Sequence, residues 1–113
     1  MSQTGLSKKE LFEELKNPSC RYIECLIVND IGKLCENTDE KSRKEGEEAL
    51  REILKSSSDK INKITAFFWL SVLENLGKRT LLTLKEFKNN PDNKALVQKA
   101  QRSIEKYKEN QSN

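Results

Sequence analysis

The stretch ITAFFWLSVL, residues 64–73, decides the fold of this chain. It is the longest apolar run, and it holds the only Trp and two of the four Phe in a 113-residue chain of which 35% is charged. The helix it predicts places Ile61, Ile64, Phe68, Val72 and Leu76 on one face, with Phe67, Trp69, Leu70 and Leu73 on the others. A helix that is apolar around most of its circumference must be surrounded by partners. We therefore expect this segment to be the central helix on which the others pack.

Helix signals also dominate the first half of the chain. Ser7 and Glu10 form a capping-box pattern, and Asn17 with Pro18 ends that first helix. A second helix is expected over about residues 18–35, with a core stripe of Ile23, Ile27, Ile31 and Leu34. A cap-like pair at Asn37 and Glu40 starts a third helix that extends to about Lys55.

The second half shows three further helix signals. Ser58 or Asp59 caps the central helix, and Gly77 predicts a left-handed stop after Leu76. A short helix over about residues 80–88 then presents Leu81, Leu84 and Phe87, unless one helix continues through Gly77. Pro91 fits the first position of the last helix, whose stripe is Val97, Ala100, Ile104 and Tyr107.

These signals predict an all-α fold. Strand patterns are nearly absent, and short turns connect about six antiparallel helices, in a bundle or a right-handed helical stack. The length suits a single domain spanning residues 1–113, with frayed ends at about 1–5 and 109–113. The apolar run is about half the length that a bilayer crossing needs, and no basic-then-apolar leader opens the chain. We expect a soluble, intracellular protein, in the cytoplasm rather than the nucleus.

The residues expected of an enzyme or a metal site are missing. The chain has no His, no Gly-rich phosphate loop and no Cys-x-x-Cys pair, and Cys20, Cys25 and Cys35 fit reduced structural thiols. We expect no catalytic residue, no metal and no cofactor.

Two surfaces are candidates for binding. Tyr22 and Leu26 border the second helix's core stripe, with Asn29 and Lys33 beyond them, so these four residues form either a small partner-binding site or a wider core stripe. Residues 59–113 carry eleven Lys/Arg against six Asp/Glu, whereas residues 1–58 carry ten against twelve. Lys78, Arg79, Lys85 and Lys88 of this basic half form either a solvated surface or an anion-binding patch.

Four segments together carry a family resemblance: NPSCRYIECLIVNDIGKLCEN, EEALREILKSSSDKINKI, FFWLSVLENLGKR and NPDNKALVQKAQRSIEKYKE. In this order, over most of residues 11–109, they resemble a shortened VHS/ENTH-type domain, the helical superhelix of endosomal and clathrin adaptors. The chain is shorter than the family's eight helices and lacks its Asp-Trp pair, whose Trp contacts ubiquitin; Tyr22 is the nearest aromatic. The domain that reads the RNA polymerase tail and the N-terminal domain of transcription elongation factors are similar too.

These observations predict a non-enzymatic adaptor that binds a peptide or a small protein through an inter-helix groove. The resemblance implies a role in vesicle trafficking, with ubiquitin or a sorting peptide as candidate partners. The alternative is a basic accessory protein that contacts nucleic acid or anionic lipid through its C-terminal half.

Overall fold

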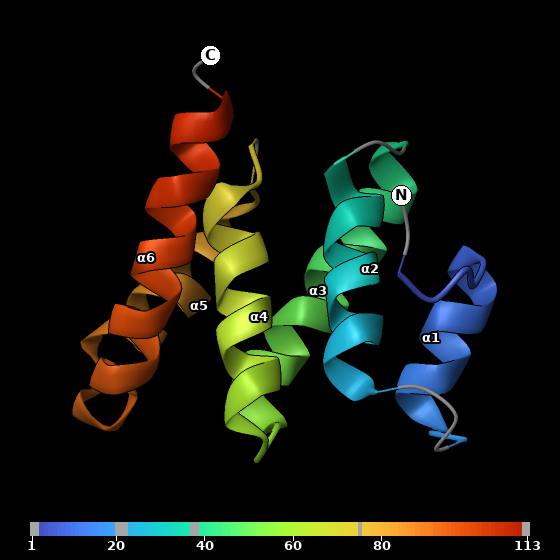
Figure 1. The fold of residues 1–113 in the computed structure, drawn as a ribbon, viewed down its shortest axis with the longest axis horizontal. Helices are drawn as coiled ribbons and strands as arrows, with labels where there is room; N and C mark the ends of the chain where they lie inside the picture. The colour runs from blue at the N-terminus through green and yellow to red at the C-terminus, as the bar shows by residue number, and fades with distance from the viewer. Residues whose placement is uncertain (1–2, 20–22, 37–38, 75, 112–113) are drawn as a thin grey trace.

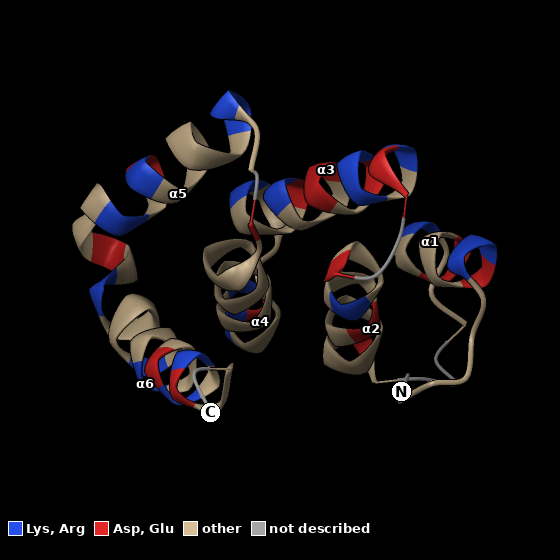
Figure 2. Cartoon of the chain, turned by 90° about the horizontal axis from the view of Figure 1, so that it is seen from above, with Lys and Arg blue, Asp and Glu red and all other residues tan. Residues whose placement is uncertain are grey.

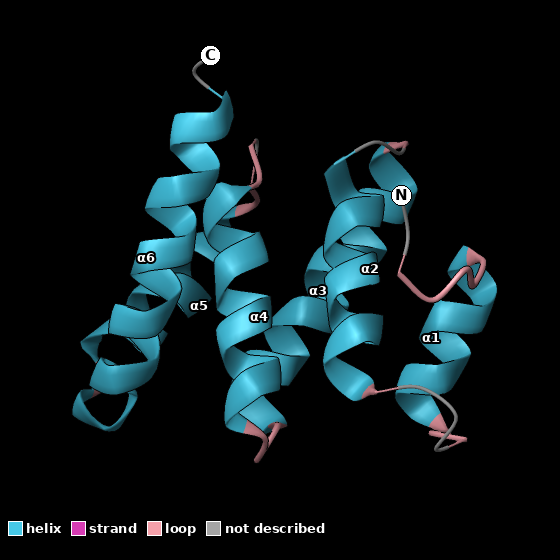
Figure 3. Ribbon diagram, viewed as in Figure 1, coloured by secondary structure: helices cyan, strands magenta, loops and turns pink. Residues whose placement is uncertain are grey.

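Helices are the only regular secondary structure in the described part of the chain. The computed structural model describes residues 3–19, 23–36, 39–74 and 76–111. Within these ranges no strand is found (Figure 3). The elements are α1 (Lys8–Lys16), α2 (Glu24–Glu36), α3 (Glu40–Ser56), α4 (Lys60–Val72), α5 (Lys78–Asn89), the 3-10 helix η1 (Pro91–Asn93) and α6 (Lys94–Gln111). The prediction of an all-α fold with about six helices is confirmed.

The helices form two layers. α2, α4 and α6 run side by side in the same direction, and α3 and α5 return behind them at an oblique angle (Figures 1 and 2). α4 packs against α2, α3, α5 and α6, whereas α1 packs mainly against α2. The expectation that the apolar run forms the central helix is confirmed.

Polar side chains fix where several helices begin. The Ser7 side chain accepts a hydrogen bond from the Glu10 backbone N–H, and the Glu10 carboxylate accepts one from the Ser7 N–H. Asp59, one of the two predicted caps, accepts from the Asn62 N–H at 3.0 Å and begins α4. Each bond satisfies a backbone donor that the first helical turn leaves without a partner.

The cap that begins α3 differs from the predicted one. Asp39 caps this helix by accepting from the Ser42 N–H at 3.2 Å, whereas the predicted Asn37 lies outside the described residues. At the other end of the chain, Pro91 occupies the first turn of η1, which leads directly into α6.

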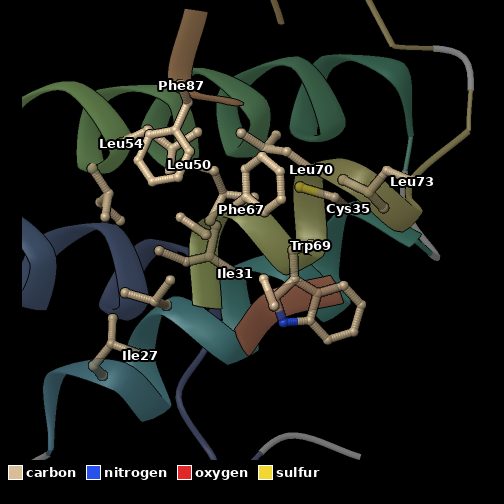
Figure 4. Packing of buried hydrophobic residues seen from close by; sticks show 14 of the residues in the cluster. Ile27, Ile31, Cys35, Leu50, Leu54, Phe67, Trp69, Leu70, Leu73 and Phe87 are labelled. Atoms are coloured by element: carbon tan, nitrogen blue, oxygen red, sulfur yellow. The ribbon is translucent and has the colours of Figure 1, made fainter. Parts of the chain in front are cut away.

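The core is centred on α4 (Figure 4). Phe67 is 2% exposed and stacks on Phe87 of α5, with ring centroids 5.2 Å apart. On another face of α4, the indole of Trp69 makes edge-on contacts with Phe68 and with Tyr107 of α6. Each large buried side chain contributes about 1.5–3 kcal/mol relative to leaving it in water.

Two glycines on neighbouring helices allow the closest approaches. A Cβ placed on Gly32 of α2 would lie 2.1 Å from Cγ of Trp69. A Cβ placed on Gly46 of α3 would lie 2.2 Å from Sγ of Cys35. Any larger residue at either position would force these helices apart or displace the facing side chain.

The face of α4 that carries Ile61, Ile64, Phe68 and Val72 is not the most buried one. Ile61 is 61% exposed, and Ile64, Phe68 and Val72 are only half-buried. The fully or nearly fully buried positions are Asn62, Ala66, Phe67, Trp69 and Leu70, because α2, α3, α5 and α6 cover the faces that carry them. Apolar spacing could not rank the faces of a helix that is apolar on all of them.

The second helix begins later than predicted. α2 starts at Glu24 rather than at Pro18, so Ile23 precedes it and is 68% exposed. The predicted stripe is therefore wrong at Ile23, while Ile27 and Ile31 are buried and Leu34 is half-buried. Val28, fully buried, joins them in the core.

The predicted role of Gly77 is wrong. α4 already ends at Val72, and Gly77 has a φ of −72° and serves as the N-cap of α5, so the helix neither stops at Leu76 nor continues through the glycine. The buried Glu47 carboxylate of α3 holds this junction by accepting from the Thr80 hydroxyl at 2.8 Å and the Gly77 N–H at 3.4 Å. Leu81, expected in the core, is 54% exposed.

Of the predicted frayed segments at about 1–5 and 109–113, residues 3–5 and 109–111 are described, and residues 1–2 and 112–113 lie outside the described residues. The Asp30 carboxylate accepts the backbone N–H groups of Gln3 and Thr4 at 2.8 and 2.9 Å and the Thr4 hydroxyl at 2.6 Å. At the other end, α6 continues to Gln111. Burial acts to raise the pKa of Asp30, but these hydrogen bonds and the charge of Lys33 outweigh it and lower that pKa. The carboxylate form is thus the one that holds the N-terminal segment on α2.

Candidate functional site

The partner-binding residues predicted on α2 are only partly accessible. Leu26, Asn29 and Lys33 share one flank of the helix by spacing, and all three are half-buried. Asn29 is engaged inside the molecule, since its Oδ1 accepts from Trp69 Nε1 at 2.7 Å and its Nδ2 donates to Gln3 Oε1 at 2.9 Å. The fourth residue of this set, Tyr22, lies outside the described residues.

The predicted anion-binding residues all lie on α5. Lys78, Arg79, Lys85 and Lys88 are exposed, and Glu86 is the one acidic residue of this helix. Lys85 and Lys88 also line a hollow of about 440 Å³ between α5 and α6, together with Lys108. No carboxylate lines this hollow, so the local potential is positive.

A groove that the sequence did not reveal lies between α1 and α3. It has a volume of about 1350 Å³, and half-buried or buried apolar side chains from both helices line it. Phe12 and Leu15 come from α1, and Ala49 and Ile53 come from α3. Their spacings of three and four residues make one apolar strip on each helix.

The apolar residues of α1 face two different directions, so that one strip enters the core and the other lines the groove. Leu11 is 3% exposed and belongs to the core, whereas its neighbour Phe12 points about 100° around the helix and lines the groove. At the start of α1, Lys8 Nζ lies 2.9 Å from Glu45 Oε2 and 2.8 Å from Ser42 Oγ, both on α3. The two helices are therefore bridged at this point, while α1 takes its main packing contacts from α2.

The rim of the groove is acidic. It carries three lysines, Lys8, Lys9 and Lys16, and six carboxylates, Glu13, Glu24, Glu45, Glu48, Glu52 and Asp59. The pair Lys8 and Glu45 neutralise each other, so five carboxylates face two lysines around the remaining rim. An apolar strip bordered by carboxylates favours an apolar ligand with positive flanks.

The cysteine thiols are the remaining groups that could react or bind a metal. Burial raises the pKa of Cys35 to about 12, and the charges of Glu47 and Glu36 add to this, against the effect of Arg43. Cys35 is therefore protonated and inert at neutral pH. Cys25 is half-buried and free, and Cys20 lies outside the described residues. Within the described ranges, no cluster of three or more Cys, Asp or Glu is arranged to hold a metal ion.

Comparison with known proteins gives no relative. No family model matches the chain, and neither a curated protein nor a solved structure is significantly similar to it. Among the helices of the described residues, none is long and apolar enough to cross a membrane.

The groove was missed because its two walls are far apart in the sequence. Phe12 and Leu15 look like core residues of α1, and Ala49 looks like a docking position of α3. One signal could have pointed to it: a helix of nine residues with Leu11, Phe12 and Leu15 carries more apolar side chains than one neighbour can cover.

Proposed function

We propose that this protein is a non-enzymatic adaptor that binds an amphipathic helical peptide in the groove between α1 and α3. The observation that carries the proposal is the apolar strip of Phe12, Leu15, Ala49 and Ile53 inside a rim with twice as many carboxylates as lysines. Helix-in-groove recognition uses this combination of features, with the ligand's apolar residues at i, i+3, i+4 and i+7 as anchors.

The charge of the rim selects the ligand. A peptide with lysine or arginine on either side of its apolar stripe would pair with Glu13, Glu48 and Glu52, whereas an acidic peptide would be repelled. These carboxylates are at the surface, where salt weakens charge pairs and largely screens those more than about 8–10 Å apart. Binding should therefore weaken as salt rises, yet persist in part because the apolar contacts are not screened.

The expected affinity is moderate. Each apolar anchor contributes about 1.5–3 kcal/mol, and association costs roughly 4–15 kcal/mol in lost freedom. A few anchors therefore leave a dissociation constant on the order of micromolar or weaker. Such an affinity suits a reversible adaptor.

The resemblance to VHS/ENTH-type domains suggests the setting. It supports a cytoplasmic role in vesicle trafficking, with a sorting peptide as the groove's ligand and ubiquitin as a folded partner. Ubiquitin would be tested on the flank of α2 that carries Leu26 and Lys33, and neither residue lines the groove. The two surfaces can therefore be tested separately.

The test is a calorimetric titration with a synthetic peptide. The peptide carries leucines at i, i+3, i+4 and i+7 and lysines on both flanks, and the comparison peptide has each lysine replaced by glutamate. We expect the basic peptide to bind and the acidic one not to bind. Ala49→Arg should abolish binding by filling the groove, and Ala95→Arg, the same change at an exposed site of α6, should leave it intact. Equal binding of the two peptides, or binding that survives Ala49→Arg, would refute the proposal.

A further inference from the structure

The outer face of α5 carries an apolar pair framed by lysines. Lys78, Leu81, Leu82 and Lys85 are spaced at i, i+3, i+4 and i+7, so they share one face of the helix. Leu81 and Leu82 are 54% and 56% exposed and lie next to each other, so they form a small exposed apolar patch. The opposite face, with Thr80, Thr83 and Phe87, is buried against the rest of the molecule. The outer face thus leaves about half of each leucine open to a partner.

This face complements the groove between α1 and α3 in both polarity and charge. On α5, two leucines lie between lysines, and Arg79 and Lys88 add positive charge against the single Glu86. In the groove, an apolar strip lies between carboxylates that outnumber lysines six to three. The spacing on α5 is also the anchor pattern expected of a helix bound in a groove.

The two surfaces cannot meet within one molecule. α5 lies at the opposite side of the structure from α1, with α3 and α4 between them (Figure 2). Among the described residues, α5 packs mainly against α3, α4 and η1. Its outer face is directed away from the groove, so contact between these two surfaces requires a second copy of the chain.

We infer that the α5 face of one copy docks in the α1–α3 groove of a second copy. This inference rests on the proposed function and names a partner for the same groove. An anionic membrane would satisfy the cations of α5 but would leave the acidic groove without a partner, whereas a second copy satisfies both surfaces at once. The contact is heterologous, because it joins different surfaces of the two copies, and it builds a head-to-tail chain or a closed ring.

The experiment is a charge exchange read by analytical ultracentrifugation over a range of protein concentrations. The groove-reversed variant carries Glu48→Lys and Glu52→Lys, and the helix-reversed variant carries Lys78→Glu and Lys85→Glu. All four residues are exposed helix positions, so both variants should fold. The wild-type chain should form larger species as concentration rises, and each variant alone should stay monomeric.

Mixing and combining the variants give the decisive results. An equal mixture should form larger species again, because the intact α5 face of the groove-reversed chain fits the intact groove of the helix-reversed chain, and the two exchanged surfaces also fit each other. A chain with all four changes should self-associate again through the exchanged charges. Lys99→Glu with Arg102→Glu, exposed residues of α6 that line neither surface, should assemble like the wild type.

Three results would overturn the inference: a wild-type chain that is monomeric throughout, variants that assemble like the wild type, or a mixture that stays monomeric. The groove itself is tested separately, by titrating the basic synthetic peptide into the helix-reversed variant, whose groove is unchanged. If the peptide binds there and the wild-type chain does not assemble, the proposed function stands and only self-association is wrong. If the peptide fails to bind, the proposed function fails with it.

Discussion

The crossing of α2 with α4 and the groove between α1 and α3 each bring the apolar side chains of two helices together, yet one is closed and the other open. At the crossing, Gly32 brings α2 so near that a single added carbon would overlap the Trp69 ring. In the groove, α1 and α3 are bridged by Lys8 at one end, and about 1350 Å³ remains between them.

The difference shows what decides whether an apolar strip becomes core or surface. α4 has helices around it that cover almost every face, so its large side chains are buried and stabilise the fold. α1 rests mainly on α2, and its second apolar strip of Phe12 and Leu15 lines the groove and is only half-buried. The central helices should therefore govern stability, and the groove should govern binding.

The largest effect is expected from Trp69→Ala in the closed region. This side chain is 4% exposed and donates a hydrogen bond to Asn29 at 2.7 Å. Its removal should lower the free energy of unfolding by about 3–5 kcal/mol, measured by urea denaturation. Phe68→Ala, at a half-buried neighbouring position, should cost less. If Trp69→Ala melted within a few degrees of the parent, the central helix would not be the core.

Gly32→Ala tests the close approach of α2 to Trp69 of α4. The sign of the change in the free energy of unfolding shows whether the two helices are in contact. In an open helix, replacing Gly by Ala stabilises by about 0.5–1 kcal/mol. At Gly32 the added Cβ meets Trp69, so overpacking should instead destabilise the protein by about 1–3 kcal/mol. Chemical denaturation measures Gly32→Ala, Trp69→Ala and the double variant. The double variant should lose less free energy of unfolding than the sum of the two single losses. A stabilised Gly32→Ala protein would show that the helices are not in close contact.

Asp30→Asn tests the tether of the N-terminal segment that leads to α1. Removing the charge weakens three hydrogen bonds and should cost about 1.5–3 kcal/mol. Because the pKa of Asp30 is lowered on folding, its contribution is present above the ordinary value of 3.8 and is lost as pH falls through the lower value of the folded state. Unfolding measured from neutral to acid pH should show this loss in the wild type and not in Asp30→Asn. Identical acid profiles would contradict the assignment.

Ala49→Arg should have the smallest effect on stability. Ala49 is half-buried at the edge of the open groove, so the longer side chain can extend into free space. The free energy of unfolding should change by about 0.5 kcal/mol or less, as measured by denaturant titration. A loss as large as that of Gly32→Ala would mean that the groove is closed in solution.

The parts of the fold that local chemistry determines could be predicted from the sequence. The capping box of Ser7 and Glu10, the cap at Asp59 and the break at Pro91 each depend on residues within a few positions of one another. Gly77 was misjudged because its neighbours suggested a helix end, while the buried Glu47 carboxylate, 30 residues earlier, holds it at a helix start.

The packing and the site depend on contacts between distant segments, which spacing does not encode. The contact of Gly32 with Trp69 joins two helices, and the buried faces of α4 follow from which neighbours cover them. Likewise, the groove exists because of where α1 lies relative to α3. The spacing of Leu26, Asn29 and Lys33 located their shared flank of α2 from the sequence. The hydrogen bond that Trp69 donates to Asn29 could not be predicted in this way.

The most direct test of this account is an NMR titration of the ¹⁵N-labelled helix-reversed variant with the basic synthetic peptide. The account predicts that the amide signals that shift most belong to Phe12, Leu15, Ala49 and Ile53, with little change at Gly32 or Trp69. Ala49→Arg in the same chain should remove those shifts while the rest of the spectrum stays folded. Shifts centred on Leu26 and Lys33 of α2, or no shifts at all, would contradict the claim that the open groove is the binding site.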